Sequence, residues 1–299
     1  MATIKLIRKY RILYLMLLSA LASYAVFQYA PMYGVIVAFK DFWITKGITG
    51  SPWVGFKHFE MFLTDDKFWE VFRNTVIISL QRLVFAFPAP IILALLLNEV
   101  RMEKIKRTIQ TIIYLPHFFS WVILSGILFS LLSDGGLVNL LIERMGGEKI
   151  YVLMDSNYFR PLLVLSTIWK EAGWGTIIYL AALASISPEM YEAAIVDGAN
   201  RWKQMIYITL PSLVPTISIL FILAVGGLMD GGFDQVFNLY NPTVYDVGDI
   251  IQTYVYRIGL AGGQISEGAA LGLFLSLINF VLLFSVHKIM KRLTGSGLF

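Results

Sequence analysis

Residues 192–199 read EAAIVDGA and residues 208–211 read ITLP, and together they form a polar interruption between two long apolar segments. The chain around them is 57% hydrophobic and only 15% charged, with a mean hydropathy of +0.70. A soluble domain does not have this composition, because it needs a polar surface to face water. We therefore expect an integral membrane protein in which the interruption is an exposed loop.

Apolar segments of spanning length occur six times along the chain. A helix needs about 20 mostly apolar residues to cross a hydrocarbon core of about 30 Å. The segments lack the alternation of barrel strands, so helices are the expected spanning form. The sequence thus predicts an all-α, polytopic fold with six transmembrane helices, at about 12–30, 74–97, 109–132, 161–184, 212–230 and 268–288. There is no cysteine, so no disulfide or thiolate site is expected.

The first apolar segment follows a basic preface and contains small residues from Ala20 to Ala25, so a cleaved signal peptide is an alternative. The apolar run continues through Val26 and Phe27, beyond a cleavage point, which favours a retained helix.

Lysine and arginine indicate the orientation of the spans. Thirteen lie in the segments on the N-terminal side of the membrane and eight in the longer opposite loops, so both termini are expected in the cytoplasm. The basic residues are scattered beside membrane spans, which argues against a nucleic-acid partner. The predicted organisation is a basic N-terminus at 1–11, a transmembrane domain at 12–290 with a cytoplasmic loop at about 185–211, and a tail at 291–299.

The cytoplasmic loop carries the start and stop signals of a short helix. Ser187 can cap it, Pro188 suits its first position, and Gly198 stands where a helix ends in a left-handed residue. We expect a helix at about 188–197 that reverses into a second helix running up to Pro211.

Small and charged residues on the first of these helices suit contact with another protein. Ala193 and Ala194 permit close approach, while Glu192 and Asp197 supply charge at the edge. A capped amphipathic helix without a partner is the alternative interpretation. The complete spacing E-A-A-x3-G-x9-I-x-L-P is much more specific than three letters, and it resembles the EAA signature of ATP-binding cassette (ABC) importer permeases.

The resemblance extends over nearly the whole chain, to the LplB-type polysaccharide permeases. The segments that carry it are 29–34 (YAPMYG), 38–42 (AFKDF), 51–55 (SPWVG), 74–75 (NT), 114–121 (YLPHFFSW), 169–174 (WKEAGW) and 232–235 (GFDQ). It implies a type I ABC importer permease fold with a coupling helix that contains Glu192, Ala193, Ala194, Asp197 and Gly198.

The same resemblance implies partners. They are a second, related permease in a heterodimer, two ATP-binding cassette ATPases on the cytoplasmic side, and an extracellular sugar-binding lipoprotein, all at the bacterial cytoplasmic (inner) membrane. The chain has no G-x-x-x-x-G-K-[ST] loop, so ATP and Mg are expected on the partner ATPase, and this subunit is expected to be non-catalytic with no cofactor of its own. Its three histidines lie on separate segments, so no metal site is expected.

Polar residues at membrane depth indicate the substrate pathway, because a charge there costs about 2.5–3.5 kcal/mol unless it is paired or wet. Lys170 and Glu171 lie near the middle of the fourth span, flanked by Trp169 and Trp174, whose flat faces suit sugar rings. Adjacent helical residues point about 100° apart, so we expect the two charges not to neutralise each other well. Alternatively, Lys170 pairs with an acid of the partner permease and the tryptophans pack between helices.

A second candidate cluster lies at residues 226–235, where glycines end the fifth span. Glycines interrupt a helix and permit close backbone approach, as in the broken helices of transport sites. Asp230, Phe233, Asp234 and Gln235 are therefore candidate substrate contacts. Close helix packing followed by an exit loop is an equally good interpretation.

Other polar or helix-breaking residues are weaker candidates. Arg82 either snorkels outward or pairs with an acid, and Pro88 and Pro90 are expected to kink the second span. His117 and Ser120 are possible substrate contacts, although a turn at a helix entry explains them equally well.

These residues distinguish three function classes: an ATP-driven importer, a secondary transporter and an intramembrane enzyme. The favoured one is half of the translocation pathway of an ATP-driven, binding-protein-dependent importer of oligo- or polysaccharides. An ABC permease for a non-sugar solute is the first alternative, and an ATP-independent secondary transporter, which would not need the EAA loop, is the second. An intramembrane enzyme would need a catalytic constellation that the sequence does not offer. The transported glycan stays open among uronate-rich chains, xylans and neutral oligosaccharides.

Overall fold

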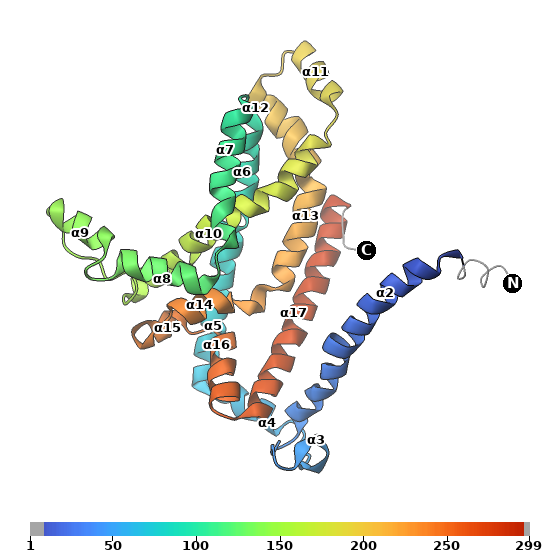
Figure 1. Ribbon diagram of the computed structural model, residues 1–299, viewed down its shortest axis with the longest axis vertical. Helices are drawn as coiled ribbons and strands as arrows, with labels where there is room; N and C mark the ends of the chain where they lie inside the picture. The colour runs from blue at the N-terminus through green and yellow to red at the C-terminus, as the bar shows by residue number, and fades with distance from the viewer. Residues whose placement is uncertain (1–8, 296–299) are drawn as a thin grey trace. The chain divides into compact units, whose positions relative to one another are not determined.

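The computed structural model describes residues 9–295, which form helices joined by short loops (Figure 1). Within this range, extended backbone pairs only at an isolated bridge between Lys40 and Trp53. The all-α prediction is confirmed. The outer parts of the predicted N-terminus (1–11) and tail (291–299) lie outside the described residues.

Two compact units make up the described chain. The first comprises the residues up to Asp65 together with Val255–Phe274, and the second comprises Asp66–Tyr254 and the residues from Leu275 onward.

The first unit begins with a long apolar helical run. The run consists of α2 (Arg11–Tyr24), the π turn η1 (Ala25–Tyr29) and the 3-10 helix η2 (Ala30–Phe39). Its only buried side chains are Val37 and Ala38, near its end. An apolar helix with so little internal cover suits a hydrocarbon environment or a partner chain.

Short helices and aromatic side chains follow in the same unit. These are α3 (Gly47–Gly50) and α4 (Lys57–Leu63). Phe39 stacks on Trp53 with the ring centroids 5.7 Å apart. The unit also contains the π turn η8 (Tyr256–Ala261) and the start of α17 (Ile265–Thr294).

The second unit starts with one continuous helix over the predicted second span. It is built from α5 (Asp66–Gln81), the π turn η3 (Arg82–Ala86) and α6 (Pro88–Glu99). Pro88 and Pro90 fall in the first turn after η3. A proline lacks an N–H donor, and a wider π turn ahead of it accommodates the altered hydrogen bonding.

The predicted third span, 109–132, is wrong as a single helix. The chain forms α7 (Glu103–Tyr114), the 3-10 turn η4 (Leu115–Phe118) and then α8 (Trp121–Leu132). Ser120 caps the new helix by accepting a hydrogen bond from the backbone N–H of Ile123. A proline in η4 and this cap end one helix and start another.

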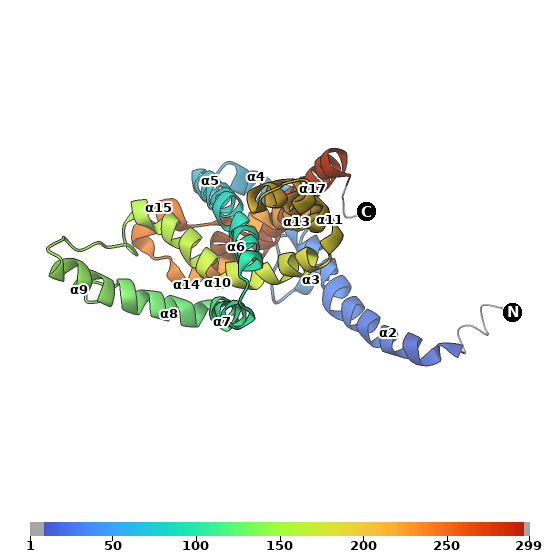
Figure 2. The ribbon, with the colours of Figure 1, turned by 90° about the horizontal axis from the view of Figure 1, so that it is seen from above.

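The helix α10 (Ser156–Ala184) contains the predicted fourth span and packs against α6, α7 and α13 (Figures 1 and 2). α13 (Leu210–Gly226) ends before the predicted limit of the fifth span, residue 230. The remaining elements of the second unit are α9 (Leu137–Arg144), η6 (Leu228–Asp230), α14 (Phe233–Leu239), η7 (Pro242–Val244), α15 (Tyr245–Gly248) and most of α16 (Ile251–Val255).

Five helical stretches of the described residues are long and apolar enough to cross a membrane. α10 has the length but is not among them, because Lys170, Glu171 and two tryptophans lower its apolar character. These same side chains are candidate substrate-pathway residues in the sequence analysis.

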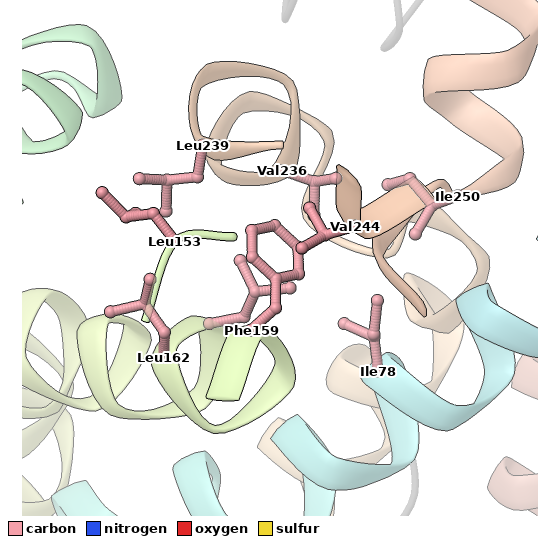
Figure 3. Close-up of a cluster of buried hydrophobic side chains, with 9 residues drawn as sticks. Ile78, Leu153, Phe159, Leu162, Val236, Leu239, Val244 and Ile250 are labelled. Carbon is pink, nitrogen blue, oxygen red and sulfur yellow. The ribbon is translucent and has the colours of Figure 1, made fainter. Parts of the chain in front are cut away.

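A buried hydrophobic cluster joins α5, α10 and α14 (Figure 3). Phe159 of α10, Ile78 of α5 and Val236 of α14 are fully buried there. A second cluster packs Ala94 of α6 and Leu213 of α13 against Tyr179 of α10. These apolar contacts fix α10 between its neighbours and so determine where its polar residues point.

Candidate functional site

The predicted loop helix is present as α11 (Pro188–Val196). The hydroxyl of Ser187 accepts a hydrogen bond from the backbone N–H of Glu189, 3.3 Å away. Gly198 follows the helix with a φ of 76°, the left-handed conformation expected of it. The helix and its glycine stop are confirmed.

Side-chain contacts tie this loop to the neighbouring helices. The reversal continues through α12 (Arg201–Gln204), and the π turn η5 (Met205–Thr209) leads into α13. The hydroxyls of Tyr191 and Thr209 lie 3.0 Å apart. Arg201 donates to Glu99 at the end of α6 over 2.8 Å. These contacts tie the loop to the start of α13 and to the end of α6.

The residues of the EAA motif lie on the surface of the described chain. Four of the five candidates are exposed and Ala194 is half-buried. The apolar side chains between them are also uncovered, with Ile195 62% and Val196 87% exposed. Figure 1 places α11 at the opposite end of the second unit from α14. An exposed apolar surface with charge at its edge is typical of a protein contact.

The two adjacent charges of α10, Lys170 and Glu171, contact each other and a histidine. Lys170 Nζ donates to the backbone carbonyl of His117 over 2.7 Å and lies 3.3 Å from Glu171 Oε1. Glu171 Oε2 lies 2.8 Å from His117 Nδ1. The expectation that Lys170 and Glu171 do not neutralise each other is wrong, because their long side chains bend toward one another despite diverging at the backbone.

Aromatic rings surround this charged group. The imidazole of His117 stacks on Trp174 with centroids 4.5 Å apart, and Phe118 meets the same indole edge-on at 5.4 Å. Lys170 Nζ lies 5.8 Å from the centroid of the Trp121 ring. Trp174 stays 41% exposed. The predicted pathway residues thus include an aromatic surface beside hydrogen-bonding groups.

Two cavities open beside the group, of about 290 Å³ and about 470 Å³. Trp121, Glu171 and Asp234 line both of them, so the two cavities are adjacent, and together they are called the cleft below. The first is also lined by Arg82, Thr167, Asp230, Gly232, Phe233 and Gln235, and the second by Phe119, Ser120, Val122, Lys170 and Asn238.

The glycines after α13 have two different structural roles. Gly231 and Gly232 have φ values of 61° and 75°, so the chain turns sharply there, as a broken helix requires. Gly226 instead packs closely, because a Cβ at that position would lie 2.6 Å from Leu283 Cδ1. Both interpretations of this cluster therefore apply, at different glycines.

The structure separates the predicted pathway residues into three groups. Glu171, Asp230, Phe233 and Asp234 line the cleft, while Lys170 is almost buried. Gln235 lines it too but is 1% exposed and fully hydrogen-bonded to protein. Trp169 and Trp174 are both partly exposed, and neither lines the two cavities.

Sequence reasoning missed Trp121 and Asn238 as lining residues. The sequence did contain a signal for Trp121. It directly follows Ser120, a residue type that caps helices, and therefore stands at the first position of a helix. Asn238 had no signal. Among the described residues, no group of three or more His, Asp or Glu side chains is arranged to hold a metal ion.

The first unit holds a separate charged cluster. Asp41 Oδ2 accepts from Lys57 Nζ over 2.9 Å, and its Oδ1 lies 3.0 Å from Nε2 of the buried His58. The hydrogen bond from Lys57 holds the pKa of Asp41 below its ordinary value of 3.8. The cluster borders a cavity of about 230 Å³ together with Trp43 and Glu267.

Comparison with known families matches residues 86–295 to the family described as the binding-protein-dependent transport system inner membrane component. The chain is 47% identical to protein LplB of Bacillus subtilis, over 96% of this chain and 91% of LplB. It is 45% identical to YteP, the polygalacturonan/rhamnogalacturonan transport system permease protein of the same organism, over 99% of this chain and 92% of YteP.

A solved structure gives a similar result. A chain of a bacterial ABC transporter involved in the import of the acidic polysaccharide alginate is 39% identical, with a TM-score of 0.91 over 98% of this chain and 100% of that one. The same transporter is known in complex with an alginate pentasaccharide-bound periplasmic protein, and the match is equally close.

Proposed function

Because this chain belongs to the family of binding-protein-dependent transport inner membrane components and is a multi-pass permease subunit of an ABC-type sugar importer, we propose that its cleft carries the sugar and that α11 couples the cleft to an ATPase. The observation that carries the coupling role is the exposed, capped α11 with Glu192, Ala193 and Ala194, followed directly by Asp197 and Gly198 in the complete EAA spacing.

The sugar path is proposed from the cleft. Trp121 offers an apolar ring face, while Glu171 and Asp234, which line both cavities, offer carboxylate acceptors. Sugars have apolar C–H faces and hydroxyl edges, so a ring beside acceptors suits them. Trp174 shapes the wall by holding the imidazole of His117, which in turn orients Glu171.

The partners are proposed from chemistry that this subunit lacks. A second related permease completes the pathway, two ATP-binding cassette ATPases hydrolyse ATP with Mg, and an extracellular sugar-binding lipoprotein delivers the substrate. Both termini face the cytoplasm in this arrangement, with α11 on the same side. Alternation between outward- and inward-facing states then follows the opening and closing of the ATPases.

Reconstitution tests this proposal. The chain is assembled in vesicles with its partner permease, the ATPase and the lipoprotein, and ATP hydrolysis and oligosaccharide uptake are measured separately. We expect loaded lipoprotein to stimulate hydrolysis and uptake to require ATP. Uptake that continues without the ATPase would contradict the importer and favour a secondary transporter.

A further inference from the structure

Arg82 lies where two cavities meet. It lines the 290 Å³ part of the cleft and also a neighbouring cavity of about 270 Å³ that extends along η3 and the end of α13. Asp230 and Gly232 line both cavities as well. These three residues therefore form the boundary between the cleft and the neighbouring cavity.

The guanidinium of Arg82 is anchored to a buried amide. One Nη donates to Gln235 Oε1, which also accepts from the Thr167 hydroxyl over 3.0 Å. Gln235 Nε2 donates to the carbonyl of Leu163 over 2.8 Å and to the hydroxyl of Ser166 over 2.7 Å. This network joins η3, α14 and α10 through hydrogen bonds between buried polar groups, which are stronger at low dielectric than in water.

The same guanidinium occupies space beside the left-handed turn. A Cβ built on Gly232 would overlap the guanidinium of Arg82. A Cβ on the neighbouring Gly231, which is also left-handed, would meet Ile250 Cδ1 at 3.0 Å instead. Arg82 Nε is buried and has no hydrogen-bond partner among the described residues. Asp230, one residue before the turn, interacts electrostatically with Arg82.

We propose that Arg82 is the positioning residue of the sugar cleft. Its guanidinium fills the space that a side chain at position 232 would take, and it holds the turn at Gly231 and Gly232 against α10. This turn positions Asp230 and Asp234 at the cleft. This inference rests on the proposed function, because it assigns to Arg82 the shape of a site through which sugar passes.

A double-mutant cycle tests the proposal on the fully assembled complex. The variants are Gly232→Ala, Arg82→Ala and both together, with Gly231→Ala as the control for left-handed strain alone. The probes are a galacturonate pentasaccharide and an arabinopentaose, titrated as free sugars. The readouts are the half-saturating sugar concentration, the maximal rate of ATP hydrolysis and the thermal unfolding of the complex.

Gly232→Ala should raise the half-saturating concentration by roughly 10-fold or more, because the new methyl displaces the guanidinium in addition to straining the turn. Gly231→Ala should cause the smaller loss. Once Arg82 is alanine, the clash is gone, and adding Gly232→Ala should cost less than roughly 3-fold more. The change should fall on the half-saturating concentration rather than on the maximal rate.

Additive losses across the cycle would overturn the role of Arg82, as would equal losses for the two glycine variants. If Gly232→Ala alone prevents assembly, recovery of assembly in the double variant supports the proposal and continued failure contradicts it. If neither saccharide stimulates ATP hydrolysis by the wild-type complex, the proposed function is contradicted instead. The role of Arg82 is then still tested by whether the effects of the two substitutions on thermal unfolding are additive.

Discussion

The imidazole of His117 and the indole of Trp174 stack face to face, with centroids 4.5 Å apart and planes inclined by 2°. His117 lies in the turn between α7 and α8, whereas Trp174 lies in α10. The stack therefore joins this turn to the helix that carries Lys170 and Glu171. Nδ1 of the same imidazole contacts Glu171. The orientation of the carboxylate at the cleft therefore depends on the tryptophan.

Trp174→Ala removes this stack, and we expect it to lower sugar-stimulated ATP hydrolysis while the complex still assembles. An aromatic pair contributes about 0.5–1.5 kcal/mol beyond its buried area, so the fold should survive the change. Trp169→Ala is the matched control, since Trp169 is a similarly exposed tryptophan of the same helix that takes no part in the stack on His117. Equal losses of stimulation in both variants would contradict a specific role for Trp174.

Glu171→Gln should destabilise the complex, because Lys170 is nearly buried and keeps only a carbonyl as its partner. We expect a loss of roughly 1–2 kcal/mol, below the value for a fully buried pair because Glu171 is partly exposed. Adding Lys170→Met should restore part of the loss. Thermal unfolding of the assembled complex measures both steps, and a double variant less stable than Glu171→Gln would argue against the pairing.

Glu192→Lys reverses a charge on the exposed face of α11, and Gly198→Val forces a β-branched residue into a left-handed conformation at a cost of about 1–3 kcal/mol. Both should spare sugar capture by the binding protein and lower uptake, through weaker ATPase association or unproductive hydrolysis.

A loop glycine of ordinary conformation provides the control for that experiment. A Cβ on Gly135 would meet no atom within 4 Å, so Gly135→Val should transport like the wild type. Vesicles allow ATPase association, hydrolysis and uptake to be measured separately. Normal association and uptake in both α11 variants would mean that α11 is not the coupling helix.

Asp41 should make the stability of the first unit depend on pH. Its folded pKa is lowered by the hydrogen bond from Lys57, so its contribution is complete above the ordinary value of 3.8 and is lost as the pH falls below 3.8 through the folded value. Asp41→Asn should therefore increase amide exchange around residues 40–58 at pH 6, and the difference from the wild type should shrink as the pH falls below 3.8, so that it is smaller at pH 3. An equal difference at both pH values would mean that the carboxylate charge is not responsible.

The membrane class, the helical fold and the loop helix were all predictable from local sequence. Hydrophobic length determines whether a helix can span a bilayer, and neighbouring residues determine a cap or a stop. The same local reasoning failed at 109–132, where a proline and a capping serine inside an apolar run outweighed its hydrophobicity and split one predicted helix into two.

The cleft itself was only partly predictable. The sequence identified Lys170, Glu171 and the residues around Asp230 as polar groups that need an explanation at membrane depth. Only the tertiary structure brought His117 to Glu171 and Arg82 to Gln235, residues that are 54 and 153 positions apart. Local signals decide where a helix begins, ends and is apolar, but contacts between helices depend on their packing angles and on the rotamers of long side chains, which no single segment determines.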